Sequence, residues 1–124
     1  MPIKVVLADG SDLMLRQVGE FLATHPQIEL VGQAASFDDA VRMAAELQPD
    51  VVVVDLGMAK RAADPLRLKA HQASLPVLAI SAANVDEETL ALAADIGADK
   101  LLDKMQLDSE LIPIIMKLAA RKPS

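Results

Sequence analysis

The sequence predicts one α/β domain, a doubly wound parallel sheet of five strands with helices on both faces. Apolar runs that suit buried strands alternate along the whole chain with amphipathic, helix-like segments, and this order is typical of parallel strands joined by crossover helices. The length of 124 residues suits a single core, because two cores would each bury too little surface. We therefore expect one domain that covers residues 1–124.

Each expected strand is a short apolar run that ends near a polar residue. The clearest is Val51–Asp55, four valines followed by an acid, which indicates a parallel strand buried on both faces. The other expected strands cover residues 3–8, 28–31, 77–80 and 101–103.

Capping and stop signals bound the first two helices. The first should begin at Ser11, a residue type that favours the N-cap, and end near Thr24 before Pro26. The second should follow a capping box that starts at Ser36. The residues expected on the inner faces of these two helices are Met14, Val18, Phe21, Leu22, Phe37, Val41, Ala44 and Ala45.

Helix signals are weakest from Gly57 to His71. Asp64 and Pro65 suggest an N-cap and a first helical residue there, well after the preceding strand ends. We therefore expect a long loop that lies over the carboxyl end of the Val51–Asp55 strand.

The remaining helices have clearer limits. Acidic residues from Asp86 suit the positive end of a helix, and Gly97 suits the position just after its last turn. The last helix should start at Asp108 or Ser109, which would place Pro113 near its first turn, where proline is tolerated.

Composition narrows the function classes. A net charge of −6 and a sequence pI of about 4.7 oppose binding to phosphate backbones, which depends on Lys and Arg. With Phe21 and Phe37 as the only aromatic residues, direct nucleic-acid contact is not expected. Cysteine is absent, no secretory signal precedes the first strand, and no apolar run approaches the roughly 20 residues that span a bilayer. We expect a cytoplasmic protein without membrane contact.

Polar residues close four of the expected strands. Asp9 follows the first strand, Asp55 ends the third, Ser81 follows the fourth and Lys104 lies just beyond the fifth. Parallel strands aligned side by side would bring these residues to one edge of the sheet, where open α/β sheets bind ligands. Carboxylates, a hydroxyl and an ammonium group suit phosphoryl transfer, in which Asp55 would be the nucleophile.

These residues and their flanking segments resemble the receiver domain of two-component response regulators. The segments that carry the resemblance are residues 5–9, 49–58, 76–82 and 97–104. The resemblance covers essentially the whole chain and implies a flavodoxin-like fold with strand order 2-1-3-4-5.

The resemblance also implies a site and a function. Asp55 would be the phosphoacceptor, Ser81 the switch hydroxyl and Lys104 the lysine that contacts the phosphoryl group. Asp9, Asp55 and the backbone carbonyl of Gly57 would hold Mg²⁺. A sensor histidine kinase would supply the phosphoryl group, and the domain would not be an enzyme beyond its own phosphorylation and dephosphorylation.

Three positions depart from the usual pattern of this family and suggest an atypical receiver. Gly10 stands where a second acid commonly binds the metal, so Mg²⁺ binding should be weakened or lost unless Asp12 substitutes. Leu101 stands where the family generally has Tyr or Phe, and Ala59 where it often has proline.

Other functions remain open at this point. The main alternative is a degenerate receiver, independent of phosphorylation, that binds an effector or forms a homodimer through its last strand and last two helices. A flavodoxin-like binder of small molecules is less favoured, because the acidic segment Asp9–Asp12 opposes phosphate and no aromatic pair could hold a flavin. A phosphatase is also less favoured, because this chain offers no second domain to close over a substrate.

Overall fold

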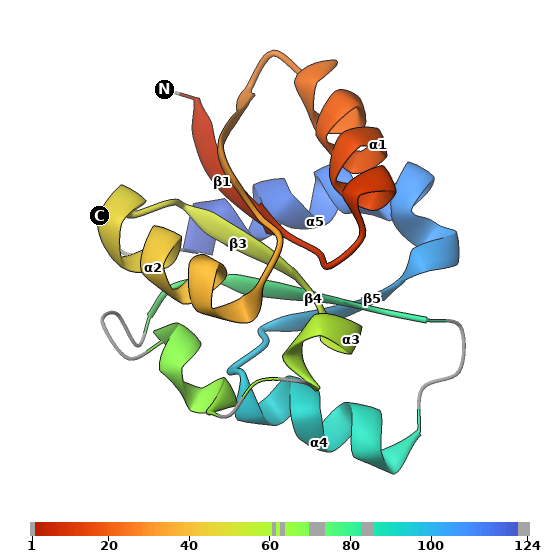
Figure 1. The fold of residues 1–124 in the computed structure, drawn as a ribbon. Coiled ribbons are helices and arrows are strands. Elements are labelled where there is room, and N and C mark those ends of the chain that lie inside the picture. Colours follow the sequence, from red (N-terminus) through yellow and green to blue (C-terminus); the bar gives the residue numbers. More distant parts are fainter. Residues whose placement is uncertain (1, 61, 63, 70–73, 83–85, 122–124) are drawn as a thin grey trace.

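The structure, a computed structural model, describes residues 2–60, 62, 64–69, 74–82 and 86–121. Five parallel strands form one sheet in the order β2-β1-β3-β4-β5 (Figure 1). The strands are β1 (Ile3–Ala8), β2 (Ile28–Ala34), β3 (Val51–Asp55), β4 (Val77–Ser81) and β5 (Lys100–Asp103). The α-helices are α1 (Asp12–Ala23), α2 (Phe37–Leu47), α3 (Leu56–Ala59), α4 (Glu87–Asp95) and α5 (Leu107–Arg121), and the 3₁₀ helices are η1 (Pro65–Lys69) and η2 (Lys104–Gln106). The predicted fold class and strand order are confirmed.

The helices cover both faces of the sheet (Figure 1). Helices α1 and α5 pack on one face, where their side chains share a core with Val51 and Val53 of β3. Helices α2, α3 and α4 pack on the other face, over Val52 and Val54. All four valines are fully buried, as expected for a strand at the centre of a sheet covered on both sides.

The first two helices begin where the capping residues predict. The Ser11 hydroxyl accepts a hydrogen bond from the backbone N–H of Met14, and the Ser36 hydroxyl accepts one from the N–H of Asp39. The inner face of α2 differs from the prediction, because Ala40 is fully buried and Ala45 is only partly buried.

Strand β2 is longer than expected. It runs to Ala34 rather than to residue 31, with a shift in its register against β1 that leaves Val31 without a direct partner. Gly32 weakens the strand signal in this stretch, yet the position needs a small residue. A Cβ there would lie 3.0 Å from the Met43 sulfur and 3.1 Å from a Leu47 methyl group, so the glycine permits close packing of α2 on the sheet.

The segment after β3 is more ordered than the sequence suggested. Helix α3 starts at Leu56, directly after the strand, where a long loop was predicted. Leu56 and Met58 are buried against the sheet, and this tertiary packing explains a helical turn that local propensity does not predict. The predicted helix start at Pro65 is confirmed, but as the 3₁₀ helix η1. His71 lies outside the described residues.

The last two helices match their predicted limits except at the start of α5. Asp86 caps α4 by accepting a hydrogen bond from the Thr89 N–H, and Gly97 follows the helix with a φ of 77°. Helix α5 begins at Leu107, one to two residues earlier than predicted, because the 3₁₀ turn η2 leads directly into it. Pro113 is therefore inside the helix rather than near its first turn. None of the described helices is long and apolar enough to cross a membrane.

Candidate functional site

The register of the strands places the predicted site residues at one edge of the sheet. Ala8 of β1 pairs with Val54 of β3, so Asp9 and Asp55 are the next residues on two neighbouring strands. Farther along the same edge, Ser81 of β4 pairs with Asp103 of β5, and Lys104 follows Asp103. The carboxyl ends of four strands thus supply the four polar residues that the sequence singled out.

A hollow of about 290 Å³ opens at this edge. Its walls bring together Asp9, Asp55, Gly57 and Lys104, four of the predicted site residues. The other described residues that line it are Gly10, Ser11 and Met58. Ser81 and Asp12 do not line this hollow.

An ion pair joins Lys104 and Asp55 in the hollow. The Nζ atom of Lys104 lies 3.6 Å from Oδ1 of Asp55, and the exposed fractions of the two side chains are 36% and 15%. A pair this open to water contributes little to stability. Its importance is chemical, because an ammonium group beside a reachable carboxylate can hold an anionic group that the carboxylate attacks.

Asp9 is the buried carboxylate of the site, with only 7% of the residue exposed. Burial raises the pKa of Asp9 above its usual value, and the negative charge of Asp55 raises it further. The N–H of Ser11, which donates a hydrogen bond to Oδ1 at 2.9 Å, and the Lys104 charge oppose these effects. A cation bound beside Asp9 would favour its ionised form.

The oxygen atoms of the hollow suit Mg²⁺. This ion commonly takes one or two carboxylates and keeps several waters. Asp9 and Asp55 provide two carboxylates, and Gly57 lines the same hollow. Within the described parts of the chain, no group of three or more His, Cys, Asp or Glu residues is placed to hold a metal. The donor set therefore fits Mg²⁺ with fewer charged ligands than a three-acid site would offer.

Gly57 lies close to the phosphoacceptor candidate. A Cβ at this position would lie 3.2 Å from Oδ2 of Asp55, which is closer than nearly all such contacts. A larger residue at position 57 would therefore displace the Asp55 carboxylate or crowd anything bound to it.

Two positions decide whether the site has a further acid for a metal: Gly10, where the family commonly has one, and Asp12, the proposed substitute. Gly10 is exposed, and a Cβ there would meet no atom within 4 Å, so an aspartate would fit at this position. Asp12 is the first residue of α1 and lines a different hollow, beside Arg16 and Glu20. The structure does not bring Asp12 to the site.

Ser81 is buried at the end of β4, with 3% of the residue exposed. Its Oγ atom has no hydrogen-bond partner among the described residues. Buried hydroxyl groups are nearly always paired, so this hydroxyl is a donor that is free for a further acceptor.

Sequence reasoning missed two residues of the hollow, Ser11 and Met58. Ser11 was recognised only as a helix cap, although its N–H also binds Asp9 across two residues, a turn that Asp residues commonly form. Met58 belongs to the segment 49–58 that carries the resemblance, but it was given no role at the site, because it lies in α3, which was not predicted.

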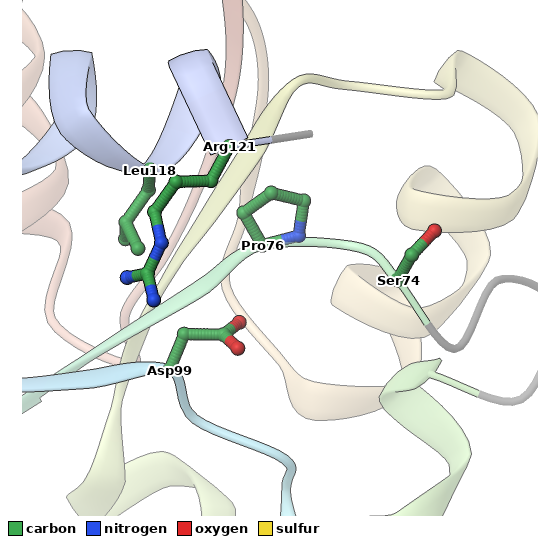
Figure 2. Close-up of a pocket in the computed structure, with 5 residues that line it drawn as sticks. All are labelled: Ser74, Pro76, Asp99, Leu118 and Arg121. Atoms are coloured by element: carbon green, nitrogen blue, oxygen red, sulfur yellow. The ribbon is translucent and has the colours of Figure 1, made fainter. Parts of the chain in front are cut away.

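A second well-formed hollow lies at the opposite edge of the sheet. Its volume is about 180 Å³, and Figure 2 shows the side chains of Asp99 and Arg121 directed into it. Oδ2 of Asp99 accepts hydrogen bonds from the N–H of Val77 at 2.8 Å and from Nζ of Lys69 at 3.1 Å. This carboxylate is engaged in holding η1 and β4 together, so the hollow is a poorer candidate for chemistry.

Comparisons with known proteins indicate the same family. The model of the response regulator receiver domain matches residues 5–116. Transcriptional regulatory protein LiaR of Bacillus subtilis is 26% identical over 122 residues, which cover 98% of this chain and 58% of LiaR. A protein-glutamate methylesterase/protein-glutamine glutaminase of Alkalilimnicola ehrlichii is 33% identical over 111 residues, which cover 87% of this chain and 28% of that protein. The chain thus spans less than two thirds of both curated relatives.

Solved structures show the same architecture. The response regulator domain of Thermotoga maritima CheB superposes with a TM-score of 0.83 at 25% identity and covers 99% of this chain and 100% of that one. The signal receiver domain of the putative response regulator NarL from Mycobacterium tuberculosis has the same fold, with a TM-score of 0.81 at 24% identity over 97% of this chain and 98% of that one.

Proposed function

The chain belongs to the response regulator receiver domain family, and on that premise we propose that residues 1–124 form one receiver domain whose Asp55 accepts a phosphoryl group from a sensor histidine kinase. Receiver domains act in two-component signal transduction. The observation that carries the proposal is the hollow in which Asp55 lies 3.6 Å from the Lys104 ammonium group, beside the buried Asp9.

The chemistry follows from the positions of these groups. An Oδ atom of Asp55 attacks the phosphorus, the bond from phosphorus to the leaving group breaks, and the leaving group departs with that electron pair. Lys104 attracts the phosphoryl oxygens as a point charge. Asp9, Asp55 and the Gly57 carbonyl are the residues that would hold Mg²⁺, which when bound neutralises charge on the phosphoryl group.

The switch in this proposal begins at Ser81. Phosphorylation adds about −1.5 to −2 charges near neutral pH, and the unpaired Ser81 hydroxyl can donate to a phosphoryl oxygen. Movement of the end of β4 toward the phosphoryl group would alter the surface formed by α4, β5 and α5, which a partner protein would read.

Beryllofluoride with Mg²⁺ tests this proposal. Chemical-shift changes centred on Asp55 and extending to Ser81 are expected in the wild-type protein, and intact-mass analysis should show a phosphoryl adduct after incubation with acetyl phosphate. Asp55→Asn should lose both responses. Gly10→Asp is the matched positive control, because position 10 has room for the added carboxylate, and it should respond at lower Mg²⁺ concentration.

A second candidate function is a receiver that works without phosphorylation. Gly10 favours it, because the site is left with two carboxylates where the family commonly has three. Such a domain would bind an effector or a second copy of itself through α4, β5 and α5. If the wild-type protein stays silent at high Mg²⁺ while Gly10→Asp responds, the second function is the correct one.

A further inference from the structure

The hollow around Asp55 adjoins a second one. The second hollow has a volume of about 360 Å³ and lies toward the start of α2. Gly10 and Met58 line both. The described residues that line only the second hollow are Ala35, Ser36, Phe37, Asp38 and Ala62. We call this second hollow the α2 hollow.

Gly10 leaves the boundary between the two hollows open. It is exposed, and the space that a side chain would occupy there is empty to at least 4 Å. Any larger residue at this position would stand beside Asp9, where the hollows meet. The glycine that weakens the metal site therefore also joins the Asp55 hollow to the space beyond it.

Apolar side chains line one part of the α2 hollow, where an uncharged chain could pack. Phe37, Met58 and Ala62 give it apolar walls. Its polar groups are already engaged, because the Ser36 hydroxyl caps α2 and the Asp38 carboxylate accepts a hydrogen bond from Arg67 at 3.1 Å.

Charge in the α2 hollow also disfavours an anionic occupant. None of its described lining residues is basic, and Arg67 beside it is already paired with Asp38, so an anionic occupant would find no free cationic partner among the lining residues. Its size is in the range of small-molecule sites, and it shares Gly10 and Met58 with the hollow that Asp55 lines. These features fit the organic part of a small phosphodonor.

We propose that the α2 hollow binds the uncharged acyl chain of an acyl phosphate whose phosphoryl group is transferred to Asp55, an inference that rests on the function proposed above. In this step an Asp55 oxygen forms a bond to phosphorus, and the bond between phosphorus and the acyl oxygen breaks. The acid leaves as its carboxylate with the electron pair, so that no proton is gained or lost. Chain length should then govern the rate of transfer.

Two donors of different chain length test the proposal. Butyryl phosphate and acetyl phosphate have leaving groups of nearly equal basicity, so a difference in their rates reports binding of the chain. Each methylene buried is worth about 0.8 kcal/mol, or about fourfold. Butyryl phosphate has two methylenes more than acetyl phosphate, so we expect wild-type protein with Mg²⁺ to react about 4- to 15-fold faster with it, depending on whether one or both are buried. The second-order rate constant is measured by intact mass.

Ala35→Leu is the variant that should remove this preference. Ala35 is exposed and lines only the α2 hollow, so a leucine would fill that space without touching Asp55. The rate with acetyl phosphate should stay within about twofold of wild type. Ala120→Leu, an exposed position on α5, is the matched control and should keep the wild-type preference.

The outcomes separate the two proposals. Equal rates for both donors in wild type, or a preference that survives Ala35→Leu, would overturn the inference and leave the proposed function intact. Absence of an adduct with either donor would overturn both.

An inert analogue provides a second readout. Titration with 2-oxopentylphosphonate should shift the amide signals of Ala35 and Phe37, whereas 2-oxopropylphosphonate should shift only signals around Asp55. No shift at Ala35 with the longer analogue would contradict the inference and would leave the α2 hollow to a side chain of a partner protein.

Discussion

At the scale of single residues, Asp9 is a carboxylate of the site whose burial lowers the stability of the folded protein. Its carboxylate is nearly buried, and burial and the Asp55 charge both raise its pKa. Ionised Asp9 is therefore less favourable in the folded protein than in the unfolded chain. Positions that bind cations commonly carry such a cost when the cation is absent.

Asp9→Asn should raise the stability of the metal-free protein at neutral pH. A folded-state pKa above the ordinary value of 3.8 means that the favourable contribution of protonated Asp9 is complete below 3.8 and is lost as the pH rises through the folded value. The difference in the free energy of unfolding between Asp9→Asn and wild type should therefore grow as the pH rises above 3.8 and then level off. Urea denaturation at several pH values measures it.

Mg²⁺ is the control for this variant. Added Mg²⁺ should raise the thermal midpoint of wild-type protein, because an ion that binds only the folded state stabilises it, and should have little effect on Asp9→Asn. A variant that is less stable than wild type at pH 7 would show that Asp9 contributes to the fold in another way.

Gly97→Ala should destabilise the protein by about 1–2 kcal/mol, the usual cost of a left-handed backbone for a residue with a side chain. Gly97 has a φ of 77°, and a Cβ there would lie 2.7 Å from Cδ of Lys69. Gly10→Ala is the matched control, with open space around it, and should change the free energy of unfolding by less than about 0.5 kcal/mol. Equal effects of the two substitutions would contradict this account.

The sequence located the polar residues of the site but not their mutual geometry. Asp9, Asp55 and Lys104 were placed correctly, because apolar strands of parallel sheets bring their ends to one edge. Asp12 lines another hollow, and this placement depends on the direction in which α1 leaves the site. The burial of Ser81 depends equally on packing that local sequence does not specify.

At the scale of elements, helix α5 tolerates a proline in its interior. Pro113 has no N–H to donate to the Ser109 carbonyl, the acceptor four residues earlier in an α-helix. The helix continues on both sides of it, and it is held by buried side chains at Leu111, Ile115 and Leu118. Tertiary packing therefore overrides an unfavourable local choice.

Pro113→Ala should stabilise the protein by about 2 kcal/mol. The substitution removes a helix-propensity cost of about 3 kcal/mol and is partly offset by greater freedom of the unfolded chain, worth up to about 1 kcal/mol. Pro113 is exposed, so little packing is lost. Chemical denaturation measures the change, and Lys117→Ala, also exposed on α5, should be nearly neutral. A destabilised Pro113→Ala protein would mean that the proline is needed for the path of α5.

Elements whose signals are local were predicted well, and those that depend on the rest of the fold were not. Ser36 and Asp86 mark helix starts because their side chains bind backbone N–H groups within three residues. Helix α3 has no such cap and forms because Leu56 and Met58 pack on the sheet. The extension of β2 depends similarly on pairing with β1.

At the scale of the whole molecule, one sheet divides two apolar cores. Successive residues of β3 supply opposite faces, so each core depends on the same backbone. A substitution that weakens packing on one face of β3 must therefore also affect the core on the other face. We expect the two cores to unfold as one cooperative unit.

Leu111→Ala should lower the free energy of unfolding by about 2–5 kcal/mol, the usual cost for a fully buried leucine. Probes in the two cores should report the same decrease. Methyl signals of Leu22 and Val41, one in each core, should lose intensity at the same urea concentration in both wild type and variant. Leu90→Ala, where the leucine is 54% exposed, is the control and should shift the midpoint much less. Separate midpoints for Leu22 and Val41 would show that the two faces unfold independently.

The parallel arrangement of the strands also separates two kinds of connection. The described residues that directly follow each strand lie at the edge that holds Asp55, whereas the turn between α1 and β2, residues 24–27, lies at the far edge (Figure 1). A reporter protein inserted into that turn would be distant from Asp55. The fold therefore offers a point of attachment for an optical sensor that reports occupancy of the site without obstructing access to it.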